Sequence, residues 1–85
     1  MTSTPARAPR TVRDLRAGES AVLGHPRVDD AQRRRLAEMG LRAGEDVTLA
    51  QRGVGGARVV AVHGSRIALD SRTAGLLPLA EDGAA

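Results

Sequence analysis

The pentapeptide Leu-Arg-Ala-Gly-Glu occurs twice in this chain of 85 residues, at positions 15–19 and again at 41–45. After each copy, apolar residues lie at the third and fifth positions beyond the glycine, which is the alternation of a half-buried strand. The glycine permits a positive φ in a turn, and the leucine before it can pack under that turn. A solenoid needs about three copies of a repeat. We therefore interpret both copies as one type of turn that leads into a strand.

A single helix is predicted between the two copies, over residues 30–39. Asp29 is its expected N-cap, and Gln32 completes a pair that resembles a capping box. Gly40 is the expected C′ glycine, and the leucine after it would then contact Leu36 in a Schellman-type turn. The residues expected on the buried face of this helix are Gln32, Leu36 and Met39.

The last third of the chain predicts a β-hairpin. Residues 58–63 and 66–70 form its strands, and Gly64-Ser65 is the expected two-residue turn. The cross-strand pairs expected in this register are Val62 with Ile67, Val60 with Leu69, and His63 with Arg66.

The predicted fold is a small, mainly β, SH3-like and partly open β-barrel of about five strands. One helix lies in the first long connection, and residues 71–75 form a short helical turn before a last strand at 76–79. Pro78 restricts that strand to an edge or a strand end. The domain is expected to span residues 11–80, with residues 1–10 and 81–85 as disordered tails because they contain few apolar residues.

Composition excludes several function classes. Cysteine is absent, which removes disulfides, thiolate metal sites and cysteine nucleophiles. Phe, Tyr and Trp are also absent, so base stacking and aromatic-lined grooves for proline-rich peptides lose their main contacts. The net charge of +3 comes from arginines interspersed with acidic residues and indicates no specific partner. A chain this short has no room for a deep cleft, so we expect no enzyme.

The start of the chain has no apolar run typical of a signal peptide or a membrane span, and we therefore expect a cytoplasmic protein without direct membrane insertion.

Residues 34–44, Arg-Arg-Leu-Ala-Glu-Met-Gly-Leu-Arg-Ala-Gly, resemble the "RRL-x-x-MGL-x-x-G" segment of the FeoA family. These are small cytosolic partners of the bacterial ferrous iron transporter FeoB. The opening Leu15-x-x-Gly18 and the closing residues 67–79 also resemble the family, so the likeness extends over about residues 12–79. It implies an accessory, protein-binding module of iron uptake that docks on FeoB, at its cytosolic GTPase region, and needs no cofactor.

The alternative is a regulatory module, because a related SH3-like domain forms the C-terminal part of metal-dependent repressors of the diphtheria-toxin-repressor type. A chain this short lacks the helix-turn-helix with which such repressors read DNA, and we expect no nucleic-acid partner. An exposed edge strand leaves a weak homo-oligomer open.

The predicted partner surface is the helix and its C-terminal turn, with a shallow apolar groove whose far wall is Val22 and Leu23. The basic run at residues 33–35 is either a solvated helix face, a contact to phosphate or to an acidic partner surface, or a source of an arginine finger. The residues expected to bind the partner are Leu23, Arg34, Arg35, Leu36, Met39, Leu41 and Arg42.

The weak metal candidates are His25 with Asp29 and Asp30, and His63. Asp29 is already needed as the N-cap, and His63 is expected beside a cationic arginine, which disfavours a bound cation. We therefore expect no metal site within one molecule, and a metal held by histidines of two molecules stays open.

Overall fold

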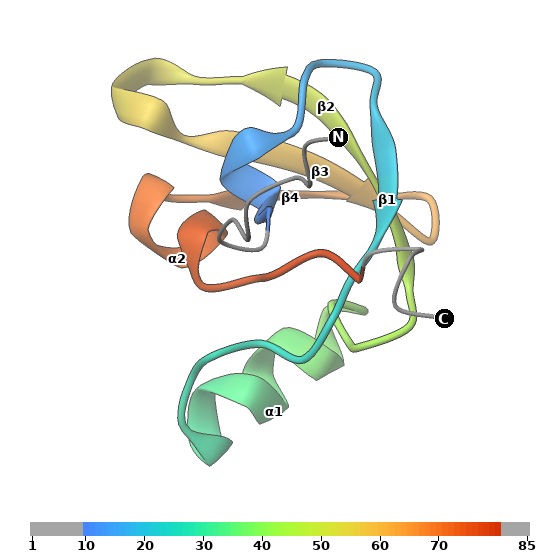
Figure 1. The fold of residues 1–85 in the computed structure, drawn as a ribbon, viewed down its shortest axis with the longest axis vertical. Helices are drawn as coiled ribbons and strands as arrows, with labels where there is room; N and C mark the ends of the chain where they lie inside the picture. Colours follow the sequence, from blue (N-terminus) through green and yellow to red (C-terminus); the bar gives the residue numbers. More distant parts are fainter. Residues whose placement is uncertain (1–9, 81–85) are drawn as a thin grey trace, which may run out of the picture.

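A four-stranded antiparallel sheet in the order β1-β2-β3-β4 is the largest element of the fold (Figure 1). The computed structural model describes residues 10–80. The strands are β1 (Ser20–Val22), β2 (Asp46–Arg52), β3 (Arg58–Val62) and β4 (Ser65–Leu69). The helices are α1 (Asp30–Glu38) and α2 (Ser71–Gly75), with 3-10 turns η1 (Val12–Asp14) and η2 (Val54–Gly56).

The predicted fifth strand at residues 76–79 is present as two isolated bridges. Pro78 pairs with Thr11, and Leu79 pairs with Leu23 just beyond β1. The chain therefore continues the sheet past its β1 edge. The mainly β architecture, with one helix in the first long connection and a short helix before the last extended segment, is confirmed (Figure 1).

The two Leu-Arg-Ala-Gly-Glu copies form equivalent turns. Gly18 and Gly44 have φ values of 88° and 92°, in the left-handed region that favours glycine. The leucines that begin the copies, Leu15 and Leu41, are 0% and 1% exposed. In both copies the glutamate N–H donates back to the arginine carbonyl, at 2.8 Å in the first and 3.1 Å in the second. The interpretation of one turn used twice is confirmed.

The two turns also pair with each other's strands. Gly18 N–H donates to the Leu49 carbonyl at 2.7 Å, and Gly44 N–H donates to the Leu23 carbonyl at 2.8 Å. The reverse bonds run from the same two leucines to the glutamates of the turns, both at 2.9 Å. Each turn is thus fixed by the strand segment that follows the other turn.

Helix α1 has both predicted caps. The Asp29 carboxylate accepts from the Gln32 N–H at 2.8 Å. At the other end, Leu41 N–H donates to the Leu36 carbonyl and Gly40 N–H donates to the Ala37 carbonyl, each at 2.9 Å. These are the two hydrogen bonds of a Schellman motif.

Met39 was predicted on the buried face of the helix, and this is wrong. Its side chain is 45% exposed, whereas Leu36 is 3% and Leu41 is 1% exposed. The chain leaves the helix at Met39, which is the C-cap with φ −92° and ψ 1°. Leu41 enters the core from beyond the turn and takes the place that Met39 was expected to fill.

The hairpin register is shifted by two residues from the prediction. His63 and Gly64 form the turn, with φ values of 50° and 79°, the combination that a type I′ turn requires. Val62 therefore pairs with Ser65, and Val60 pairs with Ile67. Because the change is two residues, the apolar side chains keep the same face of the sheet. The predicted pair of His63 with Arg66 is wrong: the His63 Nε2 lies 2.8 Å from a Glu45 oxygen.

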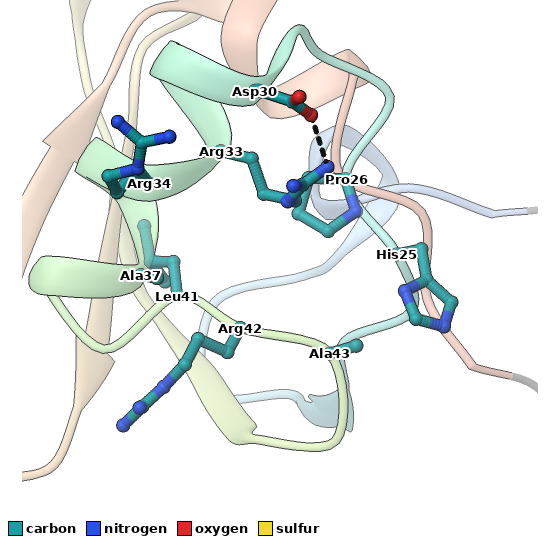
Figure 2. A pocket seen from close by; sticks show the side chains of 9 residues that line it. All are labelled: His25, Pro26, Asp30, Arg33, Arg34, Ala37, Leu41, Arg42 and Ala43. Carbon is teal, nitrogen blue, oxygen red and sulfur yellow. Dashed lines mark ion pairs between the residues drawn. The ribbon is translucent and has the colours of Figure 1, made fainter.

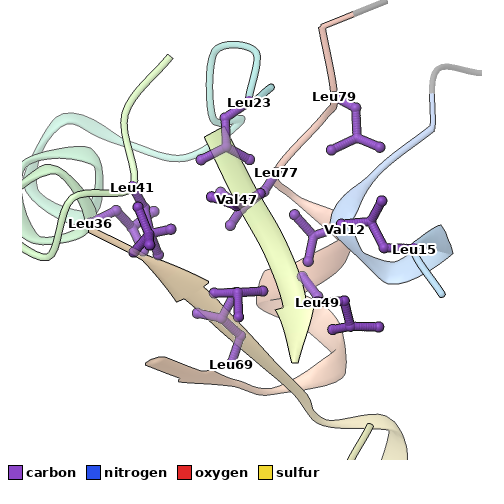
Figure 3. Close-up of a cluster of buried hydrophobic side chains, with 13 residues drawn as sticks. Val12, Leu15, Leu23, Leu36, Leu41, Val47, Leu49, Leu69, Leu77 and Leu79 are labelled. Carbon is purple, nitrogen blue, oxygen red and sulfur yellow. The ribbon is translucent and has the colours of Figure 1, made fainter. Parts of the chain in front are cut away.

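The core is entirely aliphatic, as a chain without aromatic residues requires (Figure 3). Alternate residues of β2 and β3 point into it, and leucines from both turns and from the last extended segment fill the rest. The largest fully buried side chains are Leu15, Leu23, Leu41, Leu49, Leu77, Val12, Val47 and Val60.

The ends of the domain are held by polar contacts. The prediction assigns Arg10 to the first tail. Its carbonyl accepts a hydrogen bond from Leu79 N–H at 2.8 Å, and its side chain forms an ion pair with Glu19 at 3.0 Å. The remainder of the two predicted tails, residues 1–9 and 81–85, lies outside the described residues. At α2, the Asp70 carboxylate is the N-cap and accepts from Thr73 N–H at 2.7 Å.

The close approach of α1 to the β3–β4 turn predicts a difference between two glycines. A Cβ at Gly40 would lie 3.1 Å from the His63 ring, whereas a Cβ at Gly44 would meet nothing within 4 Å. Both have a positive φ, so Gly44→Ala is expected to lower the free energy of unfolding by about 1–2 kcal/mol. Gly40→Ala should lower it by more in urea denaturation, since the ring must also move. Equal losses would contradict the contact.

The protein is expected to lose stability in acid because two carboxylates favour their charged form. Accepting a hydrogen bond from the Arg16 N–H, and then from Arg10, holds the pKa of Glu19 below its ordinary value of 4.5. Accepting from Thr73 N–H holds the pKa of Asp70 below 3.8. Their contribution to stability is complete above these ordinary values and is lost as the pH falls through the lower folded values.

Urea denaturation over a pH series measures this loss. The double variant Glu19→Gln with Asp70→Asn should show a shallower fall of unfolding free energy below about pH 5 than the unmodified chain. If both proteins lose stability with the same pH dependence, other groups are responsible.

Candidate functional site

A groove of about 320 Å³ lies between α1, the loop that follows β1 and the second Leu-Arg-Ala-Gly-Glu turn (Figure 2). Its lining combines a basic rim with small apolar side chains. The residues that line it are His25, Pro26, Asp30, Arg33, Arg34, Ala37, Leu41, Arg42 and Ala43.

One wall is a single face of α1. Arg33 and Arg34 each lie three or four residues from both Asp30 and Ala37, so the four residues lie on one side of the helix. The Schellman turn then adds Leu41 at the base of the same face. The two predicted caps set where α1 begins and ends, and they thereby determine which side chains line this wall of the groove.

The opposite wall is a loop held in place by the C-terminal segment. Gly24 N–H donates to the Pro78 carbonyl and Arg27 N–H donates to the Leu76 carbonyl, both at 2.8 Å. These bonds bracket His25 and Pro26, which face α1 across the groove (Figure 2). The position of this wall depends on contacts about fifty residues apart in sequence.

The turn at the third side is stabilised by Glu45. One carboxylate oxygen lies 2.8 Å from His63 Nε2, and the other lies 3.7 Å from an Arg42 guanidinium nitrogen. Glu45 therefore links the β3–β4 turn to the arginine that lines the groove. Its side chain is 27% exposed, more enclosed than either partner.

The charge of the groove is positive. Arg33 pairs with Asp30 at 2.9 Å, and Arg42 pairs more loosely with Glu45. Within residues 10–80, Arg34 has no carboxylate within ion-pair distance. Exposed ion pairs contribute little stability, so these arginines remain available to a partner.

The structure brings together three of the residues predicted to bind a partner: Arg34, Leu41 and Arg42 line the groove. Arg35 and Met39 are exposed on other sides of the helix end. Leu23 and Leu36 are 1% and 3% exposed and belong to the core.

The predicted far wall, Val22 and Leu23, does not line this groove. Val22 instead borders a second hollow of about 340 Å³ near the β1 edge, together with Arg10 and Asp46. The actual far wall is formed by His25 and Pro26, and no local sequence pattern predicts their position opposite α1. Ala37 was also missed, although its helical spacing from Arg33 and Arg34 was a usable signal.

The residues considered as metal ligands have different roles in the structure. His25 lines the groove, the Asp29 carboxylate caps α1, and His63 contacts Glu45. Within residues 10–80, no group of three His, Cys, Asp or Glu side chains is arranged to hold a metal ion. In the same part of the chain, no helix is long and apolar enough to cross a bilayer.

A model of the FeoA domain matches residues 10–77. The chain belongs to the FeoA family. A FeoA from Stenotrophomonas maltophilia, solved as a complex with zinc and described as a prokaryotic SH3 domain protein, is 30% identical, with a TM-score of 0.71. That match covers 84% of this chain and 89% of the other. The SH3-like fold is thereby confirmed, and membership of the family supports a role in ferrous iron transport.

Two further likenesses show the fold alone. FeoA from Chlorobium tepidum is 22% identical, with a TM-score of 0.75 over 82% of this chain and 68% of the other. A manganese-dependent transcriptional repressor is 18% identical, with a TM-score of 0.70 over 91% of this chain and 44% of the repressor. A comparison with curated proteins finds no significant match.

Proposed function

We propose that this FeoA-family protein is a cytoplasmic accessory of ferrous iron uptake that binds the FeoB transporter at its cytosolic GTPase region. The observation that carries the proposal is the α1 groove, with an apolar base and arginines at its rim, in a member of this family. The relative from S. maltophilia, for which a role as a bacterial ferrous iron transport activating factor has been suggested, supports it.

The contact surface in this proposal is the groove and the helix end beside it. Arg34 and Arg42 contact the partner from the groove, Leu41 supports its base from below at 1% exposure, and Arg35 and Met39 extend the surface around the end of α1. Leu23 and Leu36 lie beneath and fix the position of these elements from the core. Binding is the whole activity: the protein performs no catalysis and uses no cofactor of its own.

A second candidate function is a regulatory module like part of a metal-dependent repressor. It rests on the fold that this chain shares with the manganese-dependent repressor over 91% of its length. DNA binding at physiological salt tests it: sequence-selective binding would favour the regulatory function, whereas weak binding with a steep salt dependence and no selectivity is electrostatic background.

The docking proposal predicts the outcome of an anaerobic NMR titration of the isotope-labelled protein with the cytosolic region of FeoB from the same organism. Chemical shift changes should concentrate on residues 34–44, with little change in η2 at the distant end of the sheet (Figure 1). A spectrum that stays unchanged at high micromolar partner would contradict docking on this region.

A further inference from the structure

We infer that the α1 groove recognises a short acidic peptide segment in which an aliphatic side chain lies between two carboxylates. The inference rests on the proposed function, because the segment would belong to the transporter's cytosolic region. It specifies what chemistry the groove selects, which membership of the family does not.

The charges of the lining favour an acidic occupant. Three arginines and one aspartate line the groove, which leaves an excess of positive charge. Arg33 is already paired with Asp30 at 2.9 Å. Within residues 10–80, Arg34 has no carboxylate partner. Arg42 shares Glu45 with His63, and the His63–Glu45 contact, at 2.8 Å, is shorter than the Arg42–Glu45 contact, at 3.7 Å. Arg34 and Arg42 are therefore the two cations best able to take carboxylates from outside.

The two arginines lie at opposite ends of the groove base. Figure 2 shows Arg34 and Arg42 on either side of Ala37 and Leu41, with their guanidinium groups directed outward from this base and with His25 and Pro26 across the groove. Guanidinium groups bind carboxylates with two parallel hydrogen bonds, which adds geometric selection to the charge. One carboxylate on each side of a central residue matches this arrangement.

The base of the groove favours an aliphatic side chain at the centre. Pro26, Ala37 and Ala43 contribute the accessible small or aliphatic surface of the lining, and Leu41, which is 1% exposed, lies beneath it. Burying a leucine or valine side chain against such surface supplies the non-directional part of the binding, at roughly 25 cal/mol per Å² of apolar surface removed from water. The arginines then select the flanking charge.

A nucleic acid fits the same groove less well. The chain has no aromatic residue on which a base could stack. The observations favour a peptide, and an oligonucleotide is one outcome of the test.

The test uses the whole chain and a synthetic peptide, Gly-Asp-Glu-Leu-Glu-Asp-Gly, blocked at both ends. A matched peptide has lysine in place of each acidic residue. In NMR titrations at physiological salt, the acidic peptide should shift the amide signals of Ala37, Leu41 and Ala43, and the lysine peptide should not. Equal shifts from both peptides, or larger shifts of the same signals from a single-stranded oligonucleotide, would overturn the inference.

Two variants that each replace one arginine by glutamate, one in the groove and one outside it, form a matched pair. Arg34→Glu should weaken binding of the acidic peptide about tenfold, because an attractive contact becomes a repulsive one. Arg52→Glu, an exposed arginine at the far end of β2, should change it less than about twofold. Both variants should keep the dispersed spectrum of the folded chain, since Arg34 is exposed and Arg52 loses only a long hydrogen bond of 3.4 Å to the Leu15 carbonyl. Equal effects of the two reversals would overturn the inference.

The same variants separate this inference from the proposed function. If the cytosolic region of FeoB binds the unmodified chain and the Arg34→Glu variant equally, docking stands and the acidic-segment inference fails. If the acidic peptide binds with the expected variant pattern but the FeoB region does not bind, the chemistry of the groove stands and the proposed partner is wrong.

Discussion

The Schellman turn at Gly40 and Leu41 joins helix α1 to the sheet. Its two backbone hydrogen bonds end α1, and they direct Leu41 into the core beside Leu36 (Figure 3). The same turn brings the end of the helix against the His63 ring and begins the second Leu-Arg-Ala-Gly-Glu segment. One local motif therefore attaches the helix to the sheet and forms the base of the groove.

The repeated pentapeptide shows why a small core without aromatic residues is sufficient here. Each copy places a leucine under its turn and donates its glycine N–H to the strand segment that follows the other copy. Because the bonds are reciprocal, the two turns and their strands support one another across the sheet. A short chain obtains closely packed aliphatic layers from two uses of the same five residues.

The sequence predicted what depends on neighbouring residues and missed what depends on distant ones. The caps of α1 and the two turns follow from local residue types, and they were predicted. The predicted hairpin register was wrong because Gly64 can form a two-residue turn with either Ser65 or His63. The structure uses His63-Gly64, which places His63 in the left-handed region of φ, and the contact between His63 and Glu45 supports this conformation. Met39 was misplaced because helical periodicity was continued through the residue at which the helix ends. The wall of the groove at His25 and Pro26 depends on bonds to the C-terminal segment, for which the sequence has no local signal.

We propose that the groove carries the protein's role in iron uptake. The most direct measurement is radiolabelled ferrous iron uptake by cells in which the chromosomal gene is replaced by the Arg34→Glu or the Arg52→Glu variant, with protein levels matched by immunoblot. We expect Arg34→Glu to lower uptake toward that of the gene deletion, and Arg52→Glu to retain normal uptake. Normal uptake with Arg34→Glu at matched protein level would contradict it.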